Sequence, residues 1–303
     1  MTRRSQRRHK WSATLTRIRG VHKGAMGAIL NRQDGVGPTG RPFLRWAGAK
    51  RAFVGQLSAL VPLQFDTYYE PFMGAASLFF FMKPAKAKLS DSATELVKTF
   101  RDVRNDPHGV HAAIAQWGVD RETYYEVRRL HNLTGVSRSA RFIYLNKTCW
   151  NGLYRVNKSG QFNVPFGLPK SQNIVSLDDL LSCSKSLQSA VAITCTDFEQ
   201  AVEDCRADDF VFFDPPYVTS HSDTGFKDYN ETLFSWDDQK RLAECAHRIA
   251  RKGTKVLVTN ADHPAITSLY HSSEVHRLYR HSTLAGSGTH RRAITELVIK
   301  VHK

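Results

Sequence analysis

The tetrapeptide at residues 214 to 217, Asp-Pro-Pro-Tyr, places a carboxylate, two prolines and an aromatic ring directly after the apolar run at residues 210 to 213. A continuous apolar run of this length predicts a strand that is covered on both faces. The prolines end the strand, because neither has a backbone N–H to donate to a neighbouring strand. In open α/β sheets, ligands bind beyond the carboxyl ends of the strands. Asp214 and the carbonyl groups beside it are therefore predicted to accept hydrogen bonds from a ligand.

Two other segments suit the binding of a nucleoside. Residues 70 to 76 run from a strand into a turn of small residues around Gly74, where a ligand can approach the backbone closely. Asp91 follows the next strand, at the position where an acid commonly binds the hydroxyl groups of a ribose. No predicted strand leads into a dinucleotide-binding fingerprint, and the triphosphate-binding pattern GxxxxGK[ST] does not occur. A nucleoside cofactor of another kind is predicted.

The elements that must position these residues are strands that alternate with helical patterns. Several of the strands are continuous apolar runs, which is typical of a mostly parallel sheet covered on both faces. The predicted fold class is therefore α/β. The strands are predicted near residues 67 to 70, 86 to 90, 191 to 195, 210 to 213, 255 to 259 and 293 to 301.

The region from residue 101 to residue 186 has a different pattern. Helical periodicity occurs at residues 110 to 117, 121 to 131 and 138 to 146. A polar loop rich in glycine and asparagine follows at residues 147 to 169. A mostly helical insertion between two parts of an α/β core would have this pattern. We expect the core to comprise residues 41 to 100 together with residues 187 to 303.

The charge of the chain predicts a polyanionic partner. Its 43 lysine and arginine residues exceed its 28 acidic residues, which gives a formal net charge of +15. Such a potential speeds association with nucleic acids. The first 40 residues contain nine basic residues and one acid, so they carry +8 of this charge. The excess on the rest of the chain is therefore moderate.

Residues 1 to 40 form a basic tail that ends in a glycine-rich linker. We expect this tail to be disordered. Four interpretations stay open: an arm that tethers the protein to DNA, a solvated extension, an upstream start codon with Met26 as the initiator, and a sequence that mimics an organelle transit peptide.

The five cysteines are odd in number and include no Cys-x-x-Cys pair. This favours a reducing cytosol and argues against a zinc site or a disulfide framework, so no metal is expected. None of them follows a proline, so the Pro-Cys nucleophile that cytosine C5 methylation needs is absent. No apolar run is long enough for a signal peptide or a membrane helix. We expect a cytoplasmic protein without membrane contact.

Together these segments resemble those of the Dam-type DNA adenine-N6 methyltransferases, in which the cofactor motif precedes the catalytic motif and a target-recognition region lies between them. The resemblance covers residues 42 to 303. Asp-Pro-Pro-Tyr is shared with other amino-methyltransferases, and the specific signal is its combination with residues 43 to 50, 70 to 74 and 141 to 167. The resemblance implies a Rossmann-like methyltransferase core, with residues 101 to 186 as the DNA-binding domain.

The resemblance further implies that S-adenosylmethionine is the methyl donor. Trp46 and Phe198 would offer stacking faces to it. Asp91 would accept hydrogen bonds from its ribose, and Lys50 would pair with its methionyl carboxylate. The residues implied to bind the donor are Trp46, Lys50, Glu70, Phe72, Gly74, Asp91, Asp197, Phe198 and Asp214.

The implied chemistry is methylation of an adenine amino group, whose nitrogen is a poor nucleophile because its lone pair is delocalised into the ring. Hydrogen bonds to the Asp214 carboxylate and the Pro215 carbonyl would draw this nitrogen toward tetrahedral geometry and stabilise the charge that develops there. Tyr217 would stack on the base, which must first leave the double helix. No covalent intermediate is required. The implied catalytic residues are Asp214, Pro215, Pro216 and Tyr217.

Double-stranded DNA is the implied partner. Arg155 can bind guanine O6 and N7 with two hydrogen bonds. Leu153 and Pro165 can contact a thymine methyl group, and Trp150 can fill the gap that a flipped base leaves. Residues 219 to 229 are expected to close over that base. The implied DNA contacts are Arg45, Trp150, Asn151, Leu153, Arg155, Asn157 and Pro165, with Arg291 and Arg292 as phosphate contacts.

The expected activity is adenine-N6 methylation within GATC by a bacterial or phage protein that is monomeric and needs no obligate protein partner. The chain departs from the family at Ala49 and Ala76, where glycines are usual, at Arg45, where a lysine is common, and at Ala93, where an asparagine often follows the ribose-binding acid. Two alternatives stay open. One is a methyltransferase that acts on RNA or protein, and the other is a DNA-binding relic that no longer binds the cofactor.

Overall fold

The structure is a computed structural model of the 303-residue chain, and it describes residues 41–157, 159–217, 234–281 and 293–302. The basic tail at residues 1 to 40 and the expected closing loop at residues 219 to 229 lie outside the described residues. Arg291 and Arg292 lie outside them as well.

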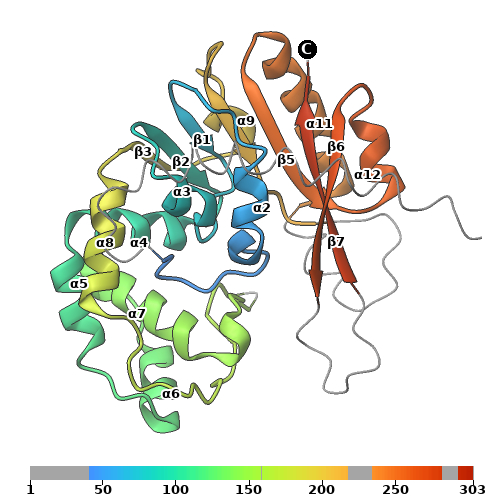
Figure 1. Cartoon of the computed structure of the whole chain (residues 1–303). Helices are drawn as coiled ribbons and strands as arrows, with labels where there is room; N and C mark the ends of the chain where they lie inside the picture. The colour runs from blue at the N-terminus through green and yellow to red at the C-terminus, as the bar shows by residue number, and fades with distance from the viewer. Residues whose placement is uncertain (1–40, 158, 218–233, 282–292, 303) are drawn as a thin grey trace, which may run out of the picture. The chain divides into compact units, whose positions relative to one another are not determined.

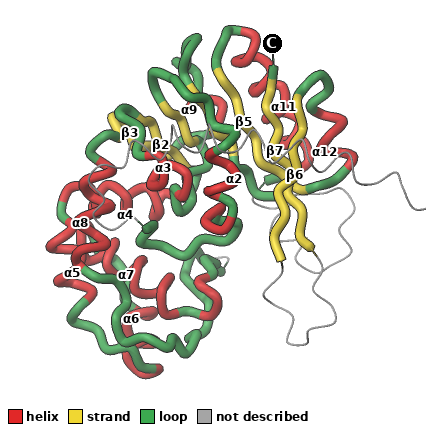
Figure 2. Tube along the Cα trace, in the orientation of Figure 1, coloured by secondary structure: helices red, strands yellow, loops and turns green. Residues whose placement is uncertain are grey.

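The described strands form one mixed sheet in the order β3-β2-β1-β4-β5-β7-β6 (Figures 1 and 2). Strand β7 runs antiparallel to β5 and β6, and the other neighbours are parallel. A mostly parallel α/β sheet is thereby confirmed, and six of the strands lie within two residues of their predicted bounds. The strands are β1 (Tyr68–Glu70), β2 (Ala87–Asp91), β3 (Ala190–Cys195), β4 (Phe210–Phe213), β5 (Lys255–Ala261), β6 (Glu274–His281) and β7 (Ala293–Val301).

Strand β6 was not predicted, because its sequence is mostly polar. Among its described side chains Leu278 is buried, whereas Glu274, Arg277 and Tyr279 are exposed. The strand lies at one edge of the sheet, where charged side chains discourage pairing with another chain. A continuous apolar run identifies a strand whose two faces are covered by other elements. Most of the described side chains of β6 are not buried, so the strand has no such run.

The strand order reverses between β1 and β4. From β1 the chain moves outward to β2 and then β3, and it returns to the other side of β1 to form β4. Parallel strands end at the same edge of a sheet, and open α/β folds bind ligands where the order reverses. Glu70, Asp91 and Asp214 lie at this edge, each at the end of its strand or directly after it.

The sheet separates two hydrophobic clusters, because alternate residues of a strand point to opposite faces. In β4, Phe210 and Phe212 belong to one cluster, and Val211 and Phe213 belong to the other. Both faces are covered, which is why the central strands are continuous apolar runs. The first cluster includes residues of α2 (Val54–Ser58), α3 (Ser77–Met82), α4 (Thr94–Asn105) and α8 (Leu177–Leu187), and the second includes residues of α9 (Phe198–Ala201), α11 (Trp236–Arg251) and α12 (Pro264–Leu269).

The middle of the chain is helical, as predicted, with α5 (Pro107–Ile114), α6 (Arg121–Arg129) and α7 (Gly135–Thr148) (Figure 1). Residues of α5 and α7 share the first hydrophobic cluster with the sheet. The predicted boundary between residues 100 and 101 falls inside α4. The division into a core and a recognition domain stays a prediction.

The polar loop after α7 folds back on itself. Isolated β bridges join Cys149 to Phe166 and Val156 to Phe162 in antiparallel pairs. The Tyr124 hydroxyl of α6 donates to the Val164 carbonyl at 2.8 Å and anchors this loop to the helices. We call residues 149 to 166 the recognition hairpin.

Candidate active site

A buried ion pair joins Lys50 to Asp214 at the carboxyl end of β4. The Nζ atom of Lys50 lies 2.6 Å from Oδ1 of Asp214 and 3.6 Å from Oε2 of Glu296, and the lysine side chain is only 3% exposed. Nζ also donates to the Gly48 carbonyl at 2.8 Å. Such partners are necessary, because an unpaired buried charge is costly. The 3-10 helix η1 (Lys50–Ala52) thus places a cation beside the tetrapeptide that is predicted to be catalytic.

Two more side chains complete what we call the Lys50 cluster. Thr259 of β5 donates its hydroxyl to Oδ1 of Asp214 at 2.6 Å, and Tyr217 donates its hydroxyl to Oε2 of Glu296 at 2.7 Å. Nζ of Lys50 lies 4.6 Å from the centre of the Tyr217 ring, within cation–π range. Burial, and then the negative charges of Asp214 and Glu296, raise the pKa of Tyr217 well above its ordinary value. Its hydroxyl therefore stays protonated and acts as a donor.

The turn after β4 is fixed by two buried amides. Gln239 of α11 donates to the Pro216 carbonyl at 3.2 Å, and Asn260 of β5 donates to Oε1 of Gln239 at 2.8 Å. Both amide side chains are fully buried. The Gln239 amide thus supplies a donor to the Pro216 carbonyl, which lies beyond the end of β4. The four predicted catalytic residues therefore lie in one supported turn.

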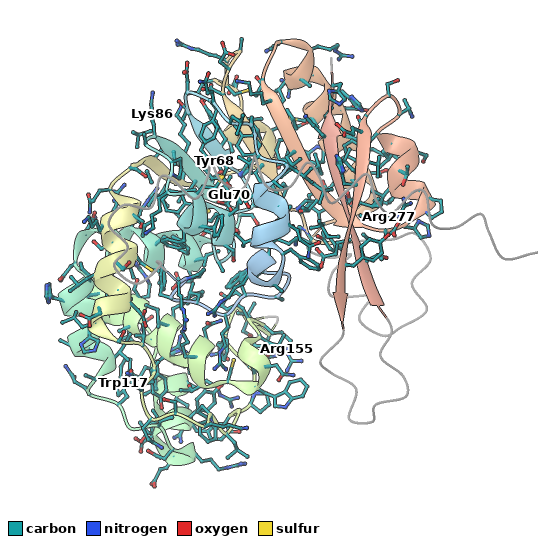
Figure 3. The ribbon with its side chains drawn as sticks, viewed as in Figure 1. Tyr68, Glu70, Lys86, Trp117, Arg155 and Arg277 are labelled. Atoms are coloured by element: carbon teal, nitrogen blue, oxygen red, sulfur yellow. The ribbon has the colours of Figure 1, made fainter. Side chains whose placement is uncertain are left out.

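Glu70 is a buried carboxylic acid at the end of β1. The Tyr68 hydroxyl donates to its Oε2 at 2.9 Å, and Figure 3 shows the two side chains beside each other in the sheet. Burial raises the pKa of Glu70 well above its ordinary value, and the hydrogen bond from Tyr68 offsets part of that rise. An opposite charge favours the ionised form of a carboxyl group. Glu70 is therefore suited to a cationic group of a ligand at this edge.

Asp91 links the end of β2 to the small-residue turn. Its Oδ2 accepts the Gly74 N–H at 3.0 Å, and its Oδ1 accepts the Ala93 N–H at 2.9 Å. Burial raises its pKa, and these hydrogen bonds act in the opposite direction. A carboxylate has about four acceptor positions. Asp91 therefore keeps capacity for further donors such as ribose hydroxyls.

The Trp46 side chain, from the segment before η1, lies in close contact with Gly74 of this turn. Gly74 has a φ of +45°, and a Cβ atom there would approach Cδ1 of Trp46 to 2.8 Å, so a side chain is excluded. The Trp46 ring stacks on Tyr154 of the recognition hairpin, with ring centroids 5.6 Å apart. The indole therefore connects the predicted cofactor turn to the predicted DNA-reading hairpin.

Ala76 has a left-handed backbone, with φ 51° and ψ 42°, where it begins α3. An L-residue with a Cβ is disfavoured in this conformation by about 1–2 kcal/mol. We expect Ala76→Gly to raise the free energy of unfolding by about 1 kcal/mol, because the relief of strain exceeds the added flexibility of the unfolded chain. Urea unfolding measures this change.

The matched control is Ala243→Gly, inside α11, which we expect to lower the free energy of unfolding by about 1 kcal/mol. A loss of stability at both positions would contradict strain at Ala76. Ala49, the other departure from glycine, has φ −53° and ψ 126° and needs no unusual conformation.

The aromatic rings of Phe72 and Phe198 stack with centroids 5.4 Å apart. The guanidinium group of Arg241 lies 5.0 Å from the Phe198 ring, which is only 4% exposed. Phe198 thus packs between Phe72 and Arg241, and little of its ring is open to a ligand. Phe72 is half-buried and keeps an accessible part.

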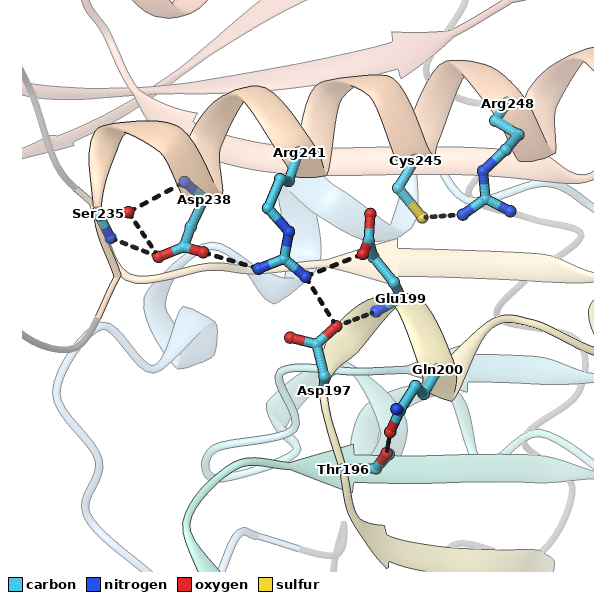
Figure 4. Close-up of polar contacts among 9 residues, drawn as sticks. All are labelled: Thr196, Asp197, Glu199, Gln200, Ser235, Asp238, Arg241, Cys245 and Arg248. Carbon is cyan, nitrogen blue, oxygen red and sulfur yellow. Dashed lines mark hydrogen bonds and ion pairs between the residues drawn. The ribbon is translucent and has the colours of Figure 1, made fainter.

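Arg241 also fixes the chain around Asp197 (Figure 4). Asp197 accepts the Glu199 N–H at 2.9 Å at the start of α9, and its Oδ1 lies 3.2 Å from the Arg241 guanidinium. The same guanidinium contacts Glu199 at 2.9 Å and Asp238 at 2.8 Å. These ion pairs are partly exposed and stabilise the fold weakly. Their effect is to hold the segment around Asp197, which is predicted to bind the methyl donor, against α11.

The segment around Arg45 is bound to the recognition hairpin through Asn146 of α7. The Arg45 N–H donates to Oδ1 of Asn146 at 2.8 Å, and the Asn146 amide donates to the Arg45 carbonyl at 2.6 Å and to the Gly152 carbonyl at 3.2 Å. The Arg45 side chain is exposed. Lys147 lies nearby, and burial followed by repulsion from Arg45 lowers its pKa to about 8. This part of the surface is therefore positively charged.

The recognition hairpin exposes Trp150 and Arg155. Trp150, in the 3-10 helix η2 (Trp150–Gly152), is 53% exposed, which is unusual for so large an apolar ring. Arg155 donates from Nε to Oδ1 of Asn163 at 2.7 Å and from a terminal nitrogen to the Asn163 carbonyl at 3.4 Å. Figure 3 shows Arg155 at the surface of the helical part, apart from Glu70.

The other predicted DNA contacts have mixed surroundings. Oδ1 of Asn157 accepts the Ser159 and Gln161 N–H groups at 3.0 and 2.9 Å, so this side chain forms the hairpin turn. Asn151 is exposed and left-handed, with φ 54°. Leu153 is half-buried, and Pro165 is exposed. The predicted site residues thus form two groups, one at the sheet edge and one on the hairpin, which Trp46 and Arg45 join.

Sequence reasoning missed Thr259, Glu296 and Asn163. Thr259 closes the apolar run of β5, and Glu296 is the one acid in β7, whose sequence is mostly apolar. A single acid in a strand that is covered on both faces could have indicated that Glu296 has a charged or hydrogen-bonding partner, since buried charges need partners. Asn163 had no such signal, because asparagine is ordinary in a polar loop.

Two further properties concern the described part of the chain. It contains no group of three or more histidine, cysteine, aspartate or glutamate residues that could hold a metal ion. It also contains no helix that is long and apolar enough to span a bilayer.

Comparison with known proteins agrees with this geometry. Residues 46–284 match the model of the D12 class N6 adenine-specific DNA methyltransferases. A type II methyltransferase of Lactococcus lactis subsp. cremoris is 33% identical over 268 residues, which cover 86% of this chain and 94% of the relative. A type II methyltransferase of Methanocaldococcus jannaschii is 34% identical over 73% of this chain and 84% of the relative, and a DNA adenine methylase of Escherichia coli K12 is 29% identical over 85% and 94%. The chain, with its Asp-Pro-Pro-Tyr turn at the point where the strand order reverses, belongs to the D12 class of N6 adenine-specific DNA methyltransferases.

Proposed function

We propose that this chain transfers the methyl group of S-adenosylmethionine to N6 of an adenine that is flipped out of duplex DNA, within the sequence GATC. The observation that carries the proposal is the Asp214 carboxylate at the end of β4, joined to Lys50 at 2.6 Å and lying in one cluster with the Tyr217 ring. Membership of an adenine-specific DNA methyltransferase family supports the substrate and the type of reaction.

The hydrogen bonds of Asp214 suggest which oxygen receives the base. Its side-chain contacts to Lys50 and Thr259, both within the described residues, end on Oδ1. Oδ2 is therefore the proposed acceptor for one N6 hydrogen, and the Pro215 carbonyl is the proposed acceptor for the other. Two acceptors beside one amino group hold the lone pair toward the incoming methyl group and stabilise the positive charge that forms.

The proposed cofactor site lies along the ends of β1 and β2. Glu70, Asp91 and the Gly74 turn fit a nucleoside with a cationic side chain, because they combine a buried and a half-buried carboxyl group with a backbone that no Cβ obstructs. S-adenosylmethionine supplies the methyl group from its sulfonium when it is bound. Lys50 already contacts Gly48, Asp214 and Glu296. A methionyl carboxylate would replace the longest of these contacts, the one to Glu296.

The proposed DNA contacts centre on the recognition hairpin. Arg155 has five N–H donors, and Asn163 receives two of them, which orients the guanidinium group and leaves donors for a guanine edge. The exposed Trp150 ring is the proposed wedge for the space of the flipped base. The proposal of GATC rests on the similarity of residues 141 to 167 to the DNA-reading segment of Dam-type enzymes.

We expect Arg155→Ala to relax specificity at one guanine of the site, with a loss of discrimination of about 1–3 kcal/mol. Methylation rates on duplexes that differ only at that base pair measure the effect. Arg129→Ala, which removes an exposed arginine from α6, serves as the control and should leave the ratio of rates unchanged. An equal loss on every sequence would assign Arg155 to the phosphate backbone instead.

The whole proposal is tested by single-molecule sequencing of DNA from cells that express the chain, read for N6-methyladenine and its context. Methylation of a motif other than GATC would overturn the specificity alone. Labelled methyl groups in RNA or protein, with none in duplex DNA, would overturn the substrate. Isothermal titration with S-adenosylmethionine tests the cofactor, because a chain that no longer catalyses the reaction and has lost its cofactor would give no binding heat.

A further inference from the structure

Glu296 lies within the Lys50 cluster, although it belongs to β7 and is far in sequence from the other members. Strand β7 runs antiparallel to β5 and pairs Glu296 with Ala261, the last residue of β5. The amino-terminal half of β7 therefore reaches the same edge at which the parallel strands end. A side chain on this half can contact the catalytic turn.

The surroundings of Glu296 make an ionisable side chain there costly. Its side chain is 12% exposed, and the next residues along the strand, Leu297, Val298 and Ile299, are fully buried. Acids are rarely buried without partners. The partners of Glu296 are the Tyr217 hydroxyl at 2.7 Å and Lys50 Nζ at 3.6 Å, and both approach Oε2.

Tyr217 is held both through its backbone and through its side-chain hydroxyl. Its backbone continues from the turn that Gln239 fixes through the Pro216 carbonyl. Its ring is half-buried, and the hydroxyl at the far end of that ring donates to Glu296. A side chain that is held at its Cα and at its hydroxyl has little freedom to swing about χ1, so the position of the ring is fixed. The raised pKa of Tyr217 keeps the hydroxyl protonated, so this bond persists at neutral pH.

We propose that Glu296 is a positioning residue, which holds the Tyr217 ring through its hydroxyl in the position from which it stacks on the target adenine. This inference rests on the proposed function, because it needs a base opposite the ring. Glu296 itself does not contact the base. Its contribution is to preorganise the stacking face before the base arrives, so that no rearrangement of the ring accompanies methyl transfer.

The test uses four variants. They are Glu296→Ala, Tyr217→Phe, the double variant that combines these two changes, and Glu296→Gln. If Glu296 acts through the hydroxyl, Glu296→Ala and Tyr217→Phe should each lower the single-turnover methylation rate by about 30-fold, and the double variant should be no more than about threefold worse than either, since both changes remove the same bond. Glu296→Gln keeps an oxygen acceptor and should stay within about fivefold of the parent rate. The KM for DNA should change little, because the hairpin contacts are intact.

The matched control is Glu274→Ala, which removes an exposed glutamate from the neighbouring strand β6 and should leave the rate unchanged. Multiplicative losses in the double variant, of about 900-fold, would overturn the proposal, because independent effects add as free energies. A Glu296→Gln rate as low as that of Glu296→Ala would also overturn it.

An activity-independent readout separates this inference from the proposed function. In the NMR spectrum of protein with ring-labelled tyrosine, the Tyr217 signal is identified by its loss in Tyr217→Phe. Glu296→Ala should shift that signal, and Glu274→Ala should not. An unshifted signal in Glu296→Ala sinks the inference even if the parent methylates DNA. A shifted Tyr217 signal in Glu296→Ala supports the contact between Tyr217 and Glu296 on which the inference rests. Absence of methyl transfer by the parent protein would count against the proposed function alone.

Discussion

Asp214→Ala should abolish methyl transfer, with a fall of about 10³-fold or more in the single-turnover rate, while binding of duplex DNA survives. The rate falls because the carboxylate acceptor for the amino group is lost, and one misplaced or missing group of this type costs about 10²–10³-fold in comparable sites. Binding survives because Trp150 and Arg155 lie on the recognition hairpin and not in the catalytic turn. Labelled methyl transfer and fluorescence anisotropy of labelled DNA measure the two quantities separately.

A second aspartate on the same strand provides the control for Asp214. Asp209 precedes β4 at the opposite end, is buried, and accepts the Thr67 N–H at 3.0 Å and the Arg206 N–H at 2.8 Å. Asp209→Asn should lower stability and leave the methylation rate of the folded protein near that of the parent. Asp214→Asn, which makes the same replacement of a carboxylate by an amide of nearly equal size, should strongly lower the methylation rate. A near-parental rate in either Asp214 variant would rule out the proposed mechanism.

Lys50→Ala should lower the free energy of unfolding by about 3 kcal/mol, the usual scale for removing one partner from a buried ion pair. The loss is large because Asp214 and Glu296 would remain partly buried without their cation. Urea unfolding of the cofactor-free protein measures it. The double variant Lys50→Met with Asp214→Asn should recover part of the loss, since the closest pair of buried charges is then absent.

Lys88 supplies the comparison for Lys50, because it also pairs with an aspartate, Asp204, but at the surface. The side chains of Lys88 and Asp204 are 27% and 64% exposed. Lys88→Ala should therefore cost less than about 1 kcal/mol. Equal losses for Lys50→Ala and Lys88→Ala would mean that the buried pair contributes no special stability, and that the cluster is held by packing instead.

The strands that carry the site could be predicted from the sequence because they are covered on both faces. Residues 210 to 213 and 293 to 301 were predicted with the observed bounds, since the first is a continuous apolar run and the second is mostly apolar. Strand β6 escaped this reasoning because it is an exposed edge. The helical middle was predicted as well, but α4 and a shared hydrophobic cluster join it to the sheet, and these are contacts between distant residues.

The sequence by itself determined the fold class and the family, and it predicted the catalytic tetrapeptide, because short patterns of residue type and spacing carry that information. Only the tertiary structure decided which residues support the tetrapeptide. Thr259 and Glu296 are 45 and 79 residues away from the residues they contact, and they reach the turn because β5 ends, and the antiparallel β7 begins, at the edge where β4 ends. It also decided that Phe198 packs between Phe72 and Arg241 and that Lys50 pairs with Asp214. Such pairings depend on strand order and register, and no local pattern of residues encodes them.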